Sequence, residues 1–272
     1  MNVSIIVTTK NEGLNIANCL KSLKLQTYTS SQIEIIVVDN DSIDKTKEVA
    51  RQYTDKVYNF GPQRSAQLNF GVRQARGRYI LFLDADMVLS KDVVKECVCN
   101  CEKKNLIALY IPERVIGQGF MGKVRDFERS FYTATCVDAV RFVKKDKFIE
   151  VNGFDETLDF GPDDWDFDRR IKRMGKVGVI SSILYHNEKE LNLKTYLRKK
   201  DRYHKSFLKY MQKWGREDGI IKKQLGFWYR FFGIFVENGK WRLLLRHPVL
   251  TLAMYPLRIV VGLRYVKKKP RL

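Results

Sequence analysis

The chain has 272 residues, 44% of them hydrophobic and 12% aromatic, so it can bury a core and is not expected to be disordered. Its five cysteines and six prolines exclude disulfide-scaffold and collagen-like proteins. The net charge of +19 is uneven, because residues 187–272 hold 22 Lys and Arg against 6 Asp and Glu while residues 1–186 are nearly neutral, which indicates an anionic partner for the C-terminal part.

Strands and helices are predicted to alternate from the N-terminus onward. Short apolar runs bounded by polar residues predict buried strands, at 3–7, 33–38 and 79–83. Apolar residues at helical spacing predict helices between them, at 14–25 and about 44–53. This alternation is typical of βαβ units, and the near-continuous apolar character of the strands fits a parallel sheet covered on both faces.

Each of the three strands is followed by polar residues, which should meet at one edge of the sheet. These residues are Thr8–Glu12, Asp39–Ser42 and Asp84–Asp86. Ligands of open α/β sheets collect beyond the carboxyl ends of the strands. One polar strand end would carry no meaning, because strands must end in turn residues, but three of them, two rich in acids, favour a site.

Asp84-Ala85-Asp86 is the strand end with the clearest chemical implication. In an extended conformation its two carboxylates point to one side while Ala85 points away. Two hard oxygen ligands at this spacing suit Mg²⁺ or Mn²⁺, with open positions left for phosphate oxygens. An isolated Asp-x-Asp is usually a surface turn, and its place after a buried strand strengthens the metal interpretation.

The cysteines predict reduced thiols rather than a metal site. Cys97, Cys99 and Cys101 lack the two-residue spacing of zinc sites. Cys97 and Cys101 would share a helix face with Val94, so core packing is the favoured interpretation. No apolar run beyond Val3–Val7 stands near the N-terminus, so no secretory signal is expected and the protein is expected in the cytoplasm.

Two further candidates follow in the second half of the chain. Asp163 and Asp164 begin a predicted helix, where acids cap free N–H groups and favour the helix dipole. Four acids within residues 163–168 exceed the needs of a cap, which favours a catalytic carboxylate. His186 follows a predicted strand at 179–185 and is either a metal ligand or a strand-end histidine bonded to a loop, since imidazole suits Mn²⁺ less well than carboxylate does.

The last third of the sequence is basic, aromatic and helical in pattern, so we predict a catalytic domain at 1–190 and a helical C-terminal region at 191–272. A helix is expected over about 193–214, with a break at 215–219. Residues 249–263 are the most apolar late segment, but they are too short and too charged to span a bilayer.

Three interpretations of this C-terminal region remain. Basic and aromatic helices lie in membrane interfaces, so we expect a contact with an anionic membrane surface. A helical cap packed on the catalytic domain is the alternative, and both can hold in part. Nucleic-acid binding is the third, but the sequence has no helix-turn-helix, zinc-finger or RNP signature, so no nucleic acid is expected as a partner.

Five blocks in order resemble the family 2 glycosyltransferases. Ser4–Glu12 resembles their first strand and Asn-Glu turn, and Ile36–Thr46 resembles their Val-Asp-Asp-Gly-Ser-x-Asp-x-Thr segment. Residues 64–86 resemble the approach to their metal motif, Asn152–Glu156 resembles Gly-Gly-Phe-Asp-Glu, and Asp163–Arg170 resembles Glu-Asp-x-Asp-Leu-x-x-Arg. The resemblance implies the GT-A fold, a mostly parallel, Rossmann-like α/β sheet flanked by helices, and nucleotide-diphospho-sugar donors.

The resemblance covers about residues 2–190 and implies donor-binding roles by position. The donor-binding residues would be Thr8, Thr9, Glu12, Asp39, Arg64, Asp84 and Ala85. Among them, Asp39 would accept a hydrogen bond from the base, and Arg64 would lie near the donor phosphates. The sequence departs from the family pattern at Asn40, Asp41, Asn152 and Asp163, which leaves the fold expectation intact.

The resemblance also implies a metal site and a catalytic base. Asp86 would bind Mn²⁺ or Mg²⁺ and the diphosphate, with Asp84 and His186 as further ligands. Asp164 would be the general base, and Asp163 would stand beside it as the second catalytic residue. A carboxylate suits this role because the attacking hydroxyl must lose a proton, while the metal offsets charge on the departing nucleoside diphosphate.

The expected reaction is therefore a metal-dependent, inverting transfer of a sugar from a nucleotide-diphospho-sugar to a hydroxyl of a lipid-linked saccharide. The enzyme is expected to work as a peripheral protein at the inner face of the cell membrane. The alternative enzyme is a polyprenyl-phosphate glycosyl synthase, whose acceptor is already anionic, so Asp164 would matter less. The basic residues expected to border the acceptor are Arg114, Lys123, Arg125 and Arg129.

Overall fold

The computed structural model describes residues 1–158, 161–188 and 204–268. Its centre is a seven-stranded sheet in the order β3-β2-β1-β4-β8-β6-β9. The strands are β1 (Val3–Thr9), β2 (Ile33–Asp39), β3 (Val57–Asn59), β4 (Tyr79–Asp84), β6 (Ala108–Tyr110), β8 (Phe142–Lys144) and β9 (Val177–Val179). Strand β8 runs antiparallel to both its neighbours and the other pairs are parallel, so the sheet is mostly parallel, as predicted.

A second, three-stranded sheet consists of β5 (Met87–Leu89), β10 (Leu184–Asn187) and β7 (Glu113–Ile116), with β10 in the middle. The single strand predicted over 179–185 is wrong, because β9 ends at Val179 and belongs to the large sheet. Between the two strands, the N–H groups of Ser181 and Ser182 donate to the Glu96 carboxylate at 2.7 and 2.8 Å. These bonds replace strand pairing and let the chain pass from one sheet to the other.

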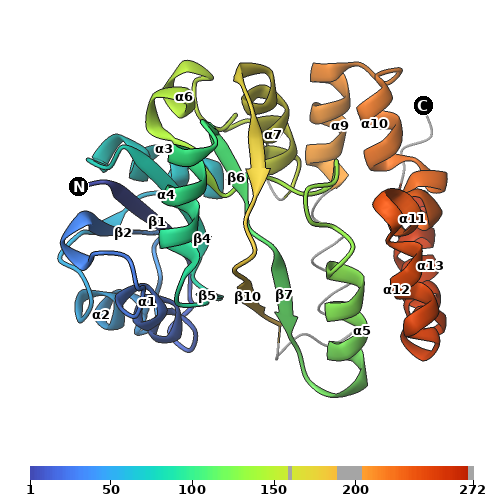
Figure 1. The fold of residues 1–272 in the computed structure, drawn as a ribbon, viewed down its shortest axis with the longest axis horizontal. Coiled ribbons are helices and arrows are strands. Elements are labelled where there is room, and N and C mark those ends of the chain that lie inside the picture. The colour runs from blue at the N-terminus through green and yellow to red at the C-terminus, as the bar shows by residue number, and fades with distance from the viewer. Residues whose placement is uncertain (159–160, 189–203, 269–272) are drawn as a thin grey trace.

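Helices cover both faces of the large sheet (Figure 1). They are α1 (Ile16–Lys24), α2 (Thr46–Arg51), α3 (Arg64–Gln74), α4 (Val93–Lys103), α6 (Lys145–Glu150) and α7 (Pro162–Met174), with a short turn η1 (Ser30–Gln32) before β2. Side chains of β1 alternate between the two cores, Ile5 facing α1 and α4 and Ile6 facing α3 and α7. This burial on both faces explains the continuous apolar strands. The predicted packing of Cys97 and Cys101 in the core is confirmed.

The C-terminal region is helical and lies along one side of the molecule, drawn in orange and red in Figure 1. Its elements are α9 (His204–Trp214), α10 (Gly219–Leu225), η2 (Tyr229–Gly233), α11 (Ile234–Val236), η3 (Glu237–Gly239), α12 (Trp241–Arg246) and α13 (Pro248–Lys268). The predicted break at 215–219 is confirmed, whereas the expected helix over 193–203 falls outside the described residues. In the described ranges no helix combines the length and apolarity that crossing a bilayer would need.

The C-terminal helices pack on α5 (Gly119–Arg129) and on α7. Ile234, Phe235 and Met254 share a core with Phe127 and Phe131. This packing agrees with the cap interpretation of the region. Three hydrogen bonds fix it further. The buried Arg258 donates to Glu128 Oε1 at 2.5 Å and to the Tyr132 hydroxyl at 2.7 Å, and Trp214 Nε1 donates to Asp166 Oδ1 at 2.8 Å.

Candidate active site

The three polar strand ends lie side by side, as predicted. Strand β1 sits between β2 and β4, and the register places Thr9 beside Asp39 and Thr8 beside Asp84. The Thr8 hydroxyl donates to Asp84 Oδ1 at 2.9 Å. The Thr9 hydroxyl is buried and has no hydrogen-bond partner, which is costly for a polar group unless a ligand supplies one.

Arg64 joins this edge of the sheet to the helix that carries the candidate base. From the first turn of α3, Nε donates to Asp84 Oδ1 at 2.7 Å. Nη1 donates to Asp164 Oδ1 at 3.0 Å and to Asp163 Oδ2 at 3.2 Å. Three carboxylates from β4 and α7 thus converge on one guanidinium.

Asp163 and Asp164 lie in different environments although they are neighbours in α7. The Asp164 carboxylate is 29% exposed, whereas that of Asp163 has no exposed surface. Asp163 faces Arg64, the Ser65 hydroxyl and the Gly161 N–H, the last donating at 2.7 Å. Of the two carboxylates, only that of Asp164 has exposed surface, while Asp163 is buried against Arg64.

The charges of the cluster shift the proton affinities of its members. Burial and the neighbouring Asp164 carboxylate raise the pKa of Asp163 to about 7, against the lowering effect of Arg64. Burial also acts to raise the pKa of Asp84, but the Arg64 guanidinium outweighs it and holds that pKa well below its usual range. Asp84 is therefore ionised at neutral pH, while Asp163 is poised between its two forms.

Replacing Asp163 by asparagine should remove a pH-dependent loss of stability. Between the ordinary pKa of 3.8 and about 7, folded Asp163 holds a proton that the unfolded chain releases. The free energy of unfolding of the wild type therefore falls as pH rises through this window, by at most about 1.4 kcal/mol per pH unit. Urea unfolding near both ends of the window should show a smaller fall for the variant, and an equal fall in both proteins would contradict this prediction.

The segment expected to be extended, Asp84-Ala85-Asp86, is not. Strand β4 ends at Asp84, and Ala85 and Asp86 form a turn in which Ala85 N donates to Thr8 O at 3.1 Å. This bond is the last one of the β1–β4 ladder, and the chain then turns at Ala85 and Asp86 to enter β5 at Met87. The expectation of two carboxylates on one side of an extended segment is therefore wrong. The side chain of Ala85, a residue expected to bind the donor, packs in the core.

Asp86 instead contacts His186, which lies in β10. His186 Nε2 is 3.0 Å from Asp86 Oδ2, and Nδ1 is 3.0 Å from Glu113 Oε1. Burial alone would lower the pKa of His186, but the two carboxylates raise it to about 10. Nothing in the sequence pattern marked Glu113, because its partner is 73 residues away along the chain.

Asp86 and His186 fit a divalent-cation site that a substrate completes. Among the described side chains, no three His, Cys, Asp or Glu residues stand where they could hold a metal ion by themselves. Asp86 Oδ1 is nevertheless buried without a hydrogen-bond partner, so it can take a ligand. Mg²⁺ and similar ions bind through one or two carboxylates together with substrate phosphates and water, which is the donor set available here.

Asp39 and Glu12 occupy the far side of the same edge. Asp39 is fully buried, and its oxygens accept from the Ser42 N–H at 2.8 Å and the Ser42 hydroxyl at 2.5 Å. The base of a nucleotide could reach the Asp39 carboxylate only if the loop that contains Ser42 moves. Glu12 Oε2 accepts a hydrogen bond from Asn15 Nδ2, and Asn15 Oδ1 accepts one from Asn187 Nδ2. These bonds connect the loop after β1 to β10, next to His186.

The arginines expected to border the acceptor are engaged elsewhere. Arg125 pairs with Glu128 and with Glu188, the latter at 3.1 Å. Arg129 pairs with Glu113 at 2.7 Å and Asp138 at 3.3 Å. These contacts make Arg125 and Arg129 structural partners of buried acids. Except for Glu128, which is also in α5, these acids lie in other segments, so the sequence alone does not show the pairing.

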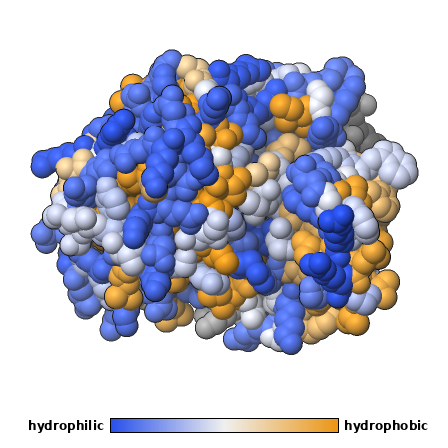
Figure 2. Space-filling model, in the orientation of Figure 1, coloured by the Kyte–Doolittle hydropathy of each residue, from blue (hydrophilic) through white to orange (hydrophobic). Residues whose placement is uncertain are grey.

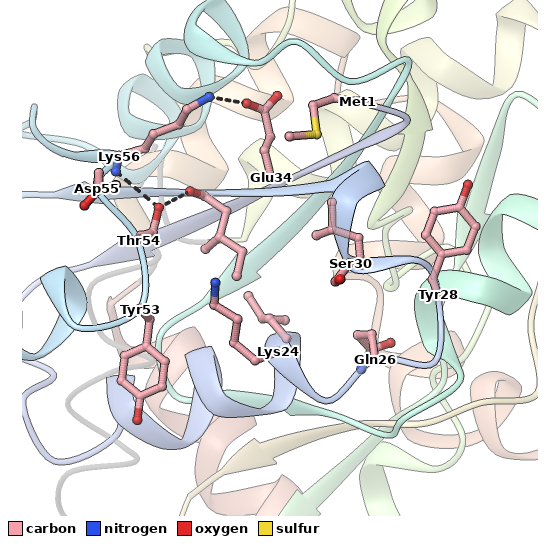
Figure 3. A pocket seen from close by; sticks show the side chains of 13 residues that line it. Met1, Lys24, Gln26, Tyr28, Ser30, Glu34, Tyr53, Thr54, Asp55 and Lys56 are labelled. Carbon is pink, nitrogen blue, oxygen red and sulfur yellow. Dashed lines mark hydrogen bonds and ion pairs between the residues drawn. The ribbon is translucent and has the colours of Figure 1, made fainter.

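A cavity of about 310 Å³ lies at the opposite end of the sheet. Figure 3 shows side chains that line it, among them Tyr28, Glu34 and Lys56, near the beginning of β2 and the loop before β3. Glu34 is already bonded to Lys56, Ser4 and the Arg76 N–H. No residue of the Arg64 cluster lines this cavity, so we place the candidate site at the carboxyl-terminal edge of the strands.

Comparisons with known proteins agree on one family. The family model described as Glycosyl transferase family 2 matches residues 4–151. The glycosyltransferase AglE of Haloferax volcanii is 42% identical over 91 residues, which are 31% of this chain and 30% of AglE. The minor teichoic acid biosynthesis protein GgaB of Bacillus subtilis is 27% identical over 204 residues, 67% of this chain and 22% of GgaB. The chain thus spans less than a third of the length of these relatives.

Solved structures share the fold. The mannosyltransferase PcManGT from Pyrobaculum calidifontis, in complex with GDP-Man and Mn²⁺, superposes with a TM-score of 0.67 at 18% identity, covering 98% of this chain and 88% of PcManGT. Residues 1–349 of S. aureus TarS in complex with UDP-GlcNAc give a TM-score of 0.56 at 17% identity, covering 100% and 93%. The predicted α/β fold of the GT-A type is thereby confirmed.

Proposed function

Because the chain belongs to glycosyl transferase family 2, we propose that it transfers a sugar from a nucleotide-diphospho-sugar to an acceptor hydroxyl. The observation that carries this proposal is the convergence of Asp84, Asp163 and Asp164 on Arg64. The Arg64 guanidinium can contribute to binding the donor diphosphate, and the exposed Asp164 carboxylate beside it can take the proton of the acceptor hydroxyl. Both are needed for glycosyl transfer.

Asp164 is the general base in this proposal. Its carboxylate is partly exposed, and Arg64 fixes one of its oxygens from the side of β4. The other oxygen can accept the proton of the attacking hydroxyl as the bond to the anomeric carbon forms. A single displacement of this kind inverts the configuration at that carbon. Arg64 lies between the base and Asp84, where its charge also favours the donor phosphates.

Asp86 and His186 would hold Mn²⁺ or Mg²⁺ together with the diphosphate oxygens. When bound, the ion offsets the charge that develops on the leaving nucleoside diphosphate. Asp84 is held in place by hydrogen bonds from Arg64 and Thr8. The complex of PcManGT with GDP-Man and Mn²⁺ supports both the donor class and the ion for a protein of this fold.

A thermal-shift panel of nucleoside diphosphates and nucleotide-sugars, with and without Mn²⁺, tests the donor proposal. A ligand at 100 times its Kd stabilises the folded state by about 2.7 kcal/mol, so the true donor should raise the melting temperature by several degrees. We expect this rise to require the metal ion. The absence of a shift with every nucleotide, in the presence of Mn²⁺, would overturn the proposal.

The acceptor is proposed to be a lipid-linked saccharide that offers a hydroxyl. A polyprenyl-phosphate acceptor would need cationic groups beside the base, and the arginines of α5 are bound to carboxylates instead. The exposed position of Asp164 favours an acceptor that must lose a proton. We assign transfer to residues 1–190 and membrane contact at the cytoplasmic leaflet to residues 191–272.

The exposed face of α13 supports the membrane contact. Met254 and Leu257 of this helix are buried, while an opposite stripe remains exposed, at Val249, Leu252, Pro256, Ile259 and Leu263. A helix that is apolar on both faces is expected to bury both of them against apolar groups. Arg258 does not interrupt this stripe, because it points inward to Glu128.

An aromatic ladder, Phe227, Trp228, Phe231 and Phe232, extends the same surface. Phe227 stacks on Phe231 at 4.5 Å between centroids, and Phe232 lies 6.2 Å from Tyr255 of α13. Trp228 is 77% exposed. Figure 2 shows apolar residues in orange along the right edge of the molecule, where Figure 1 places α11–α13. Exposed contiguous apolar surface of this kind marks interaction sites.

Charge complementarity selects an anionic bilayer as the partner. Residues 219–272 contain 12 Lys and Arg and a single acid, Glu237. Arg242 and Arg246 are exposed on α12 beside the apolar stripe. Each basic residue near anionic lipid contributes about 1 kcal/mol of binding, and exposed aromatic rings insert at the level of the headgroups.

Replacing Arg242 and Arg246 together by glutamine should weaken binding to anionic vesicles by about thirtyfold, which corresponds to about 2 kcal/mol. Trp228→Ser with Leu252→Ser should weaken binding to a similar degree by removing apolar contact. Ile149→Ser is the matched control, because it also removes an exposed apolar side chain, but from α6 and not from the C-terminal region. Ile149 is 59% exposed. Co-sedimentation with vesicles measures all three, and a wild type that stays in the supernatant at low salt would contradict the membrane proposal.

A further inference from the structure

The small sheet presents a histidine between two acids. Asp86 precedes β5, His186 lies in β10 and Glu113 begins β7, and β10 is the middle strand. The register pairs His186 with Met87 on one side, and Leu184 with Glu113 on the other. Glu113 and His186 are therefore diagonal neighbours on one face of the sheet, a separation that a long side chain can bridge.

Glu113 is held as an anion by two arginines. Its Oε2 accepts from Arg129 Nη2 at 2.7 Å and from Arg141 Nη2 at 3.2 Å. Its Oε1 faces His186 Nδ1 at 3.0 Å, so the two oxygens have separate partners. An ionised carboxylate only accepts hydrogen bonds, and the contact with Nδ1 therefore requires a proton on that nitrogen.

The other side of the ring faces Asp86. Nε2 lies 3.0 Å from Asp86 Oδ2, while Asp86 Oδ1 is buried without a partner. Because an ionised Asp86 also accepts from Nε2, the ring in the structure carries a proton on both nitrogens. A cation bound at Nε2 would take the place of the proton there, whereas Glu113 would retain the proton on Nδ1.

We propose that Glu113 is a positioning residue that fixes the proton of His186 on Nδ1 and so presents Nε2, together with Asp86, to the divalent cation. This inference rests on the proposed function for the presence of the cation. Metal-binding histidines generally donate their second N–H to a carboxylate, and loss of that carboxylate lowers metal affinity by about 10- to 100-fold. Arg129 and Arg141 support the arrangement because they keep Glu113 charged within a buried setting.

The proton position can be measured on the wild-type chain. The sequence has only three histidines, so the long-range ¹H–¹⁵N spectrum of ¹⁵N-histidine-labelled protein is simple, and His186→Asn assigns its signals. With saturating Mg²⁺ and UDP or GDP, His186 should be neutral and protonated on Nδ1. A neutral ring protonated on Nε2, or a ring that stays doubly protonated at saturation, would overturn the inference.

A double-mutant cycle tests whether Glu113 acts through His186. The readout is the Mn²⁺ concentration that gives half of the thermal stabilisation by UDP or GDP. Glu113→Gln should raise this concentration about 10- to 100-fold in the wild type and leave it unchanged in a His186→Asn background. An equal rise in both backgrounds, or no rise in either, would overturn the inference.

Glu128→Gln is the matched control. Glu128 is 3% exposed and is bonded to Arg125, Tyr132 and Arg258, so it is also a buried, ion-paired glutamate. We expect its replacement to lower stability without changing the Mn²⁺ requirement. A wild type that binds UDP or GDP independently of Mn²⁺ and Mg²⁺ would instead contradict the cation of the proposed function.

Discussion

Replacing Asp164 by asparagine should lower the turnover number by about 10²- to 10⁴-fold while donor binding stays close to that of the wild type. The amide keeps the shape of the side chain and can still accept a hydrogen bond from Arg64, but it cannot take the proton of the acceptor hydroxyl. Release of nucleoside diphosphate from the donor identified by thermal shift measures turnover, and the thermal shift itself measures binding.

Asp146→Asn is the control for this change, because Asp146 is exposed on α6 outside the cluster. Its activity should equal that of the wild type. Near-normal turnover of Asp164→Asn would remove Asp164 from the mechanism. It would also favour the alternative acceptor, since a lipid phosphate is already ionised and needs no general base.

Replacing Arg64 by methionine should lower the free energy of unfolding by about 3–5 kcal/mol near neutral pH. The change leaves Asp84, Asp163 and Asp164 close together with no cation between them. Arg64 holds the pKa of Asp84 down and limits the rise of the pKa of Asp163. Without it, Asp84 stabilises the fold less and Asp163 destabilises it more at neutral pH. The loss should shrink as pH falls and these acids become protonated in both proteins.

Urea unfolding of Arg64→Met and of the control Arg114→Met measures this difference. Arg114 makes an ion pair with Asp126, but its side chain is 49% exposed, so its loss should cost at most about 1 kcal/mol. Adding Asp163→Asn to Arg64→Met should recover part of the lost stability, because it removes one of the stranded charges. Equal losses in the two arginine variants would show that the cluster is not electrostatically coupled.

The large sheet could be predicted well from the sequence because its strands are buried on both faces. Runs such as Ile33–Val38 leave little choice but a strand, and the polar residues after them mark the edge of the sheet. The prediction of one strand over 179–185 was wrong because an apolar run carries no information on which sheet it joins. Its path depends on Glu96, whose carboxylate binds Ser181 and Ser182 from a distant helix.

The sequence could name residues that the structure brings together, but only part of the contacts between them. Asp84 and Asp164 could be named from motifs, but nothing local shows that one guanidinium bonds both of them. Glu113 was missed because a single acid before a short strand has no pattern. Its role depends on β7 lying beside β10, a pairing between segments about 70 residues apart, which only the tertiary structure defines.

The contacts of α7 with the C-terminal helices have a consequence for how the protein unfolds. Arg169 pairs with Asp218, and Trp214 covers the buried Asp166, so the helix that carries Asp164 shares its packing with the basic region. A chain cut near residue 190 would expose these groups to water. The sheet domain and the basic C-terminal helices should therefore melt together, as one cooperative unit, although their compositions differ.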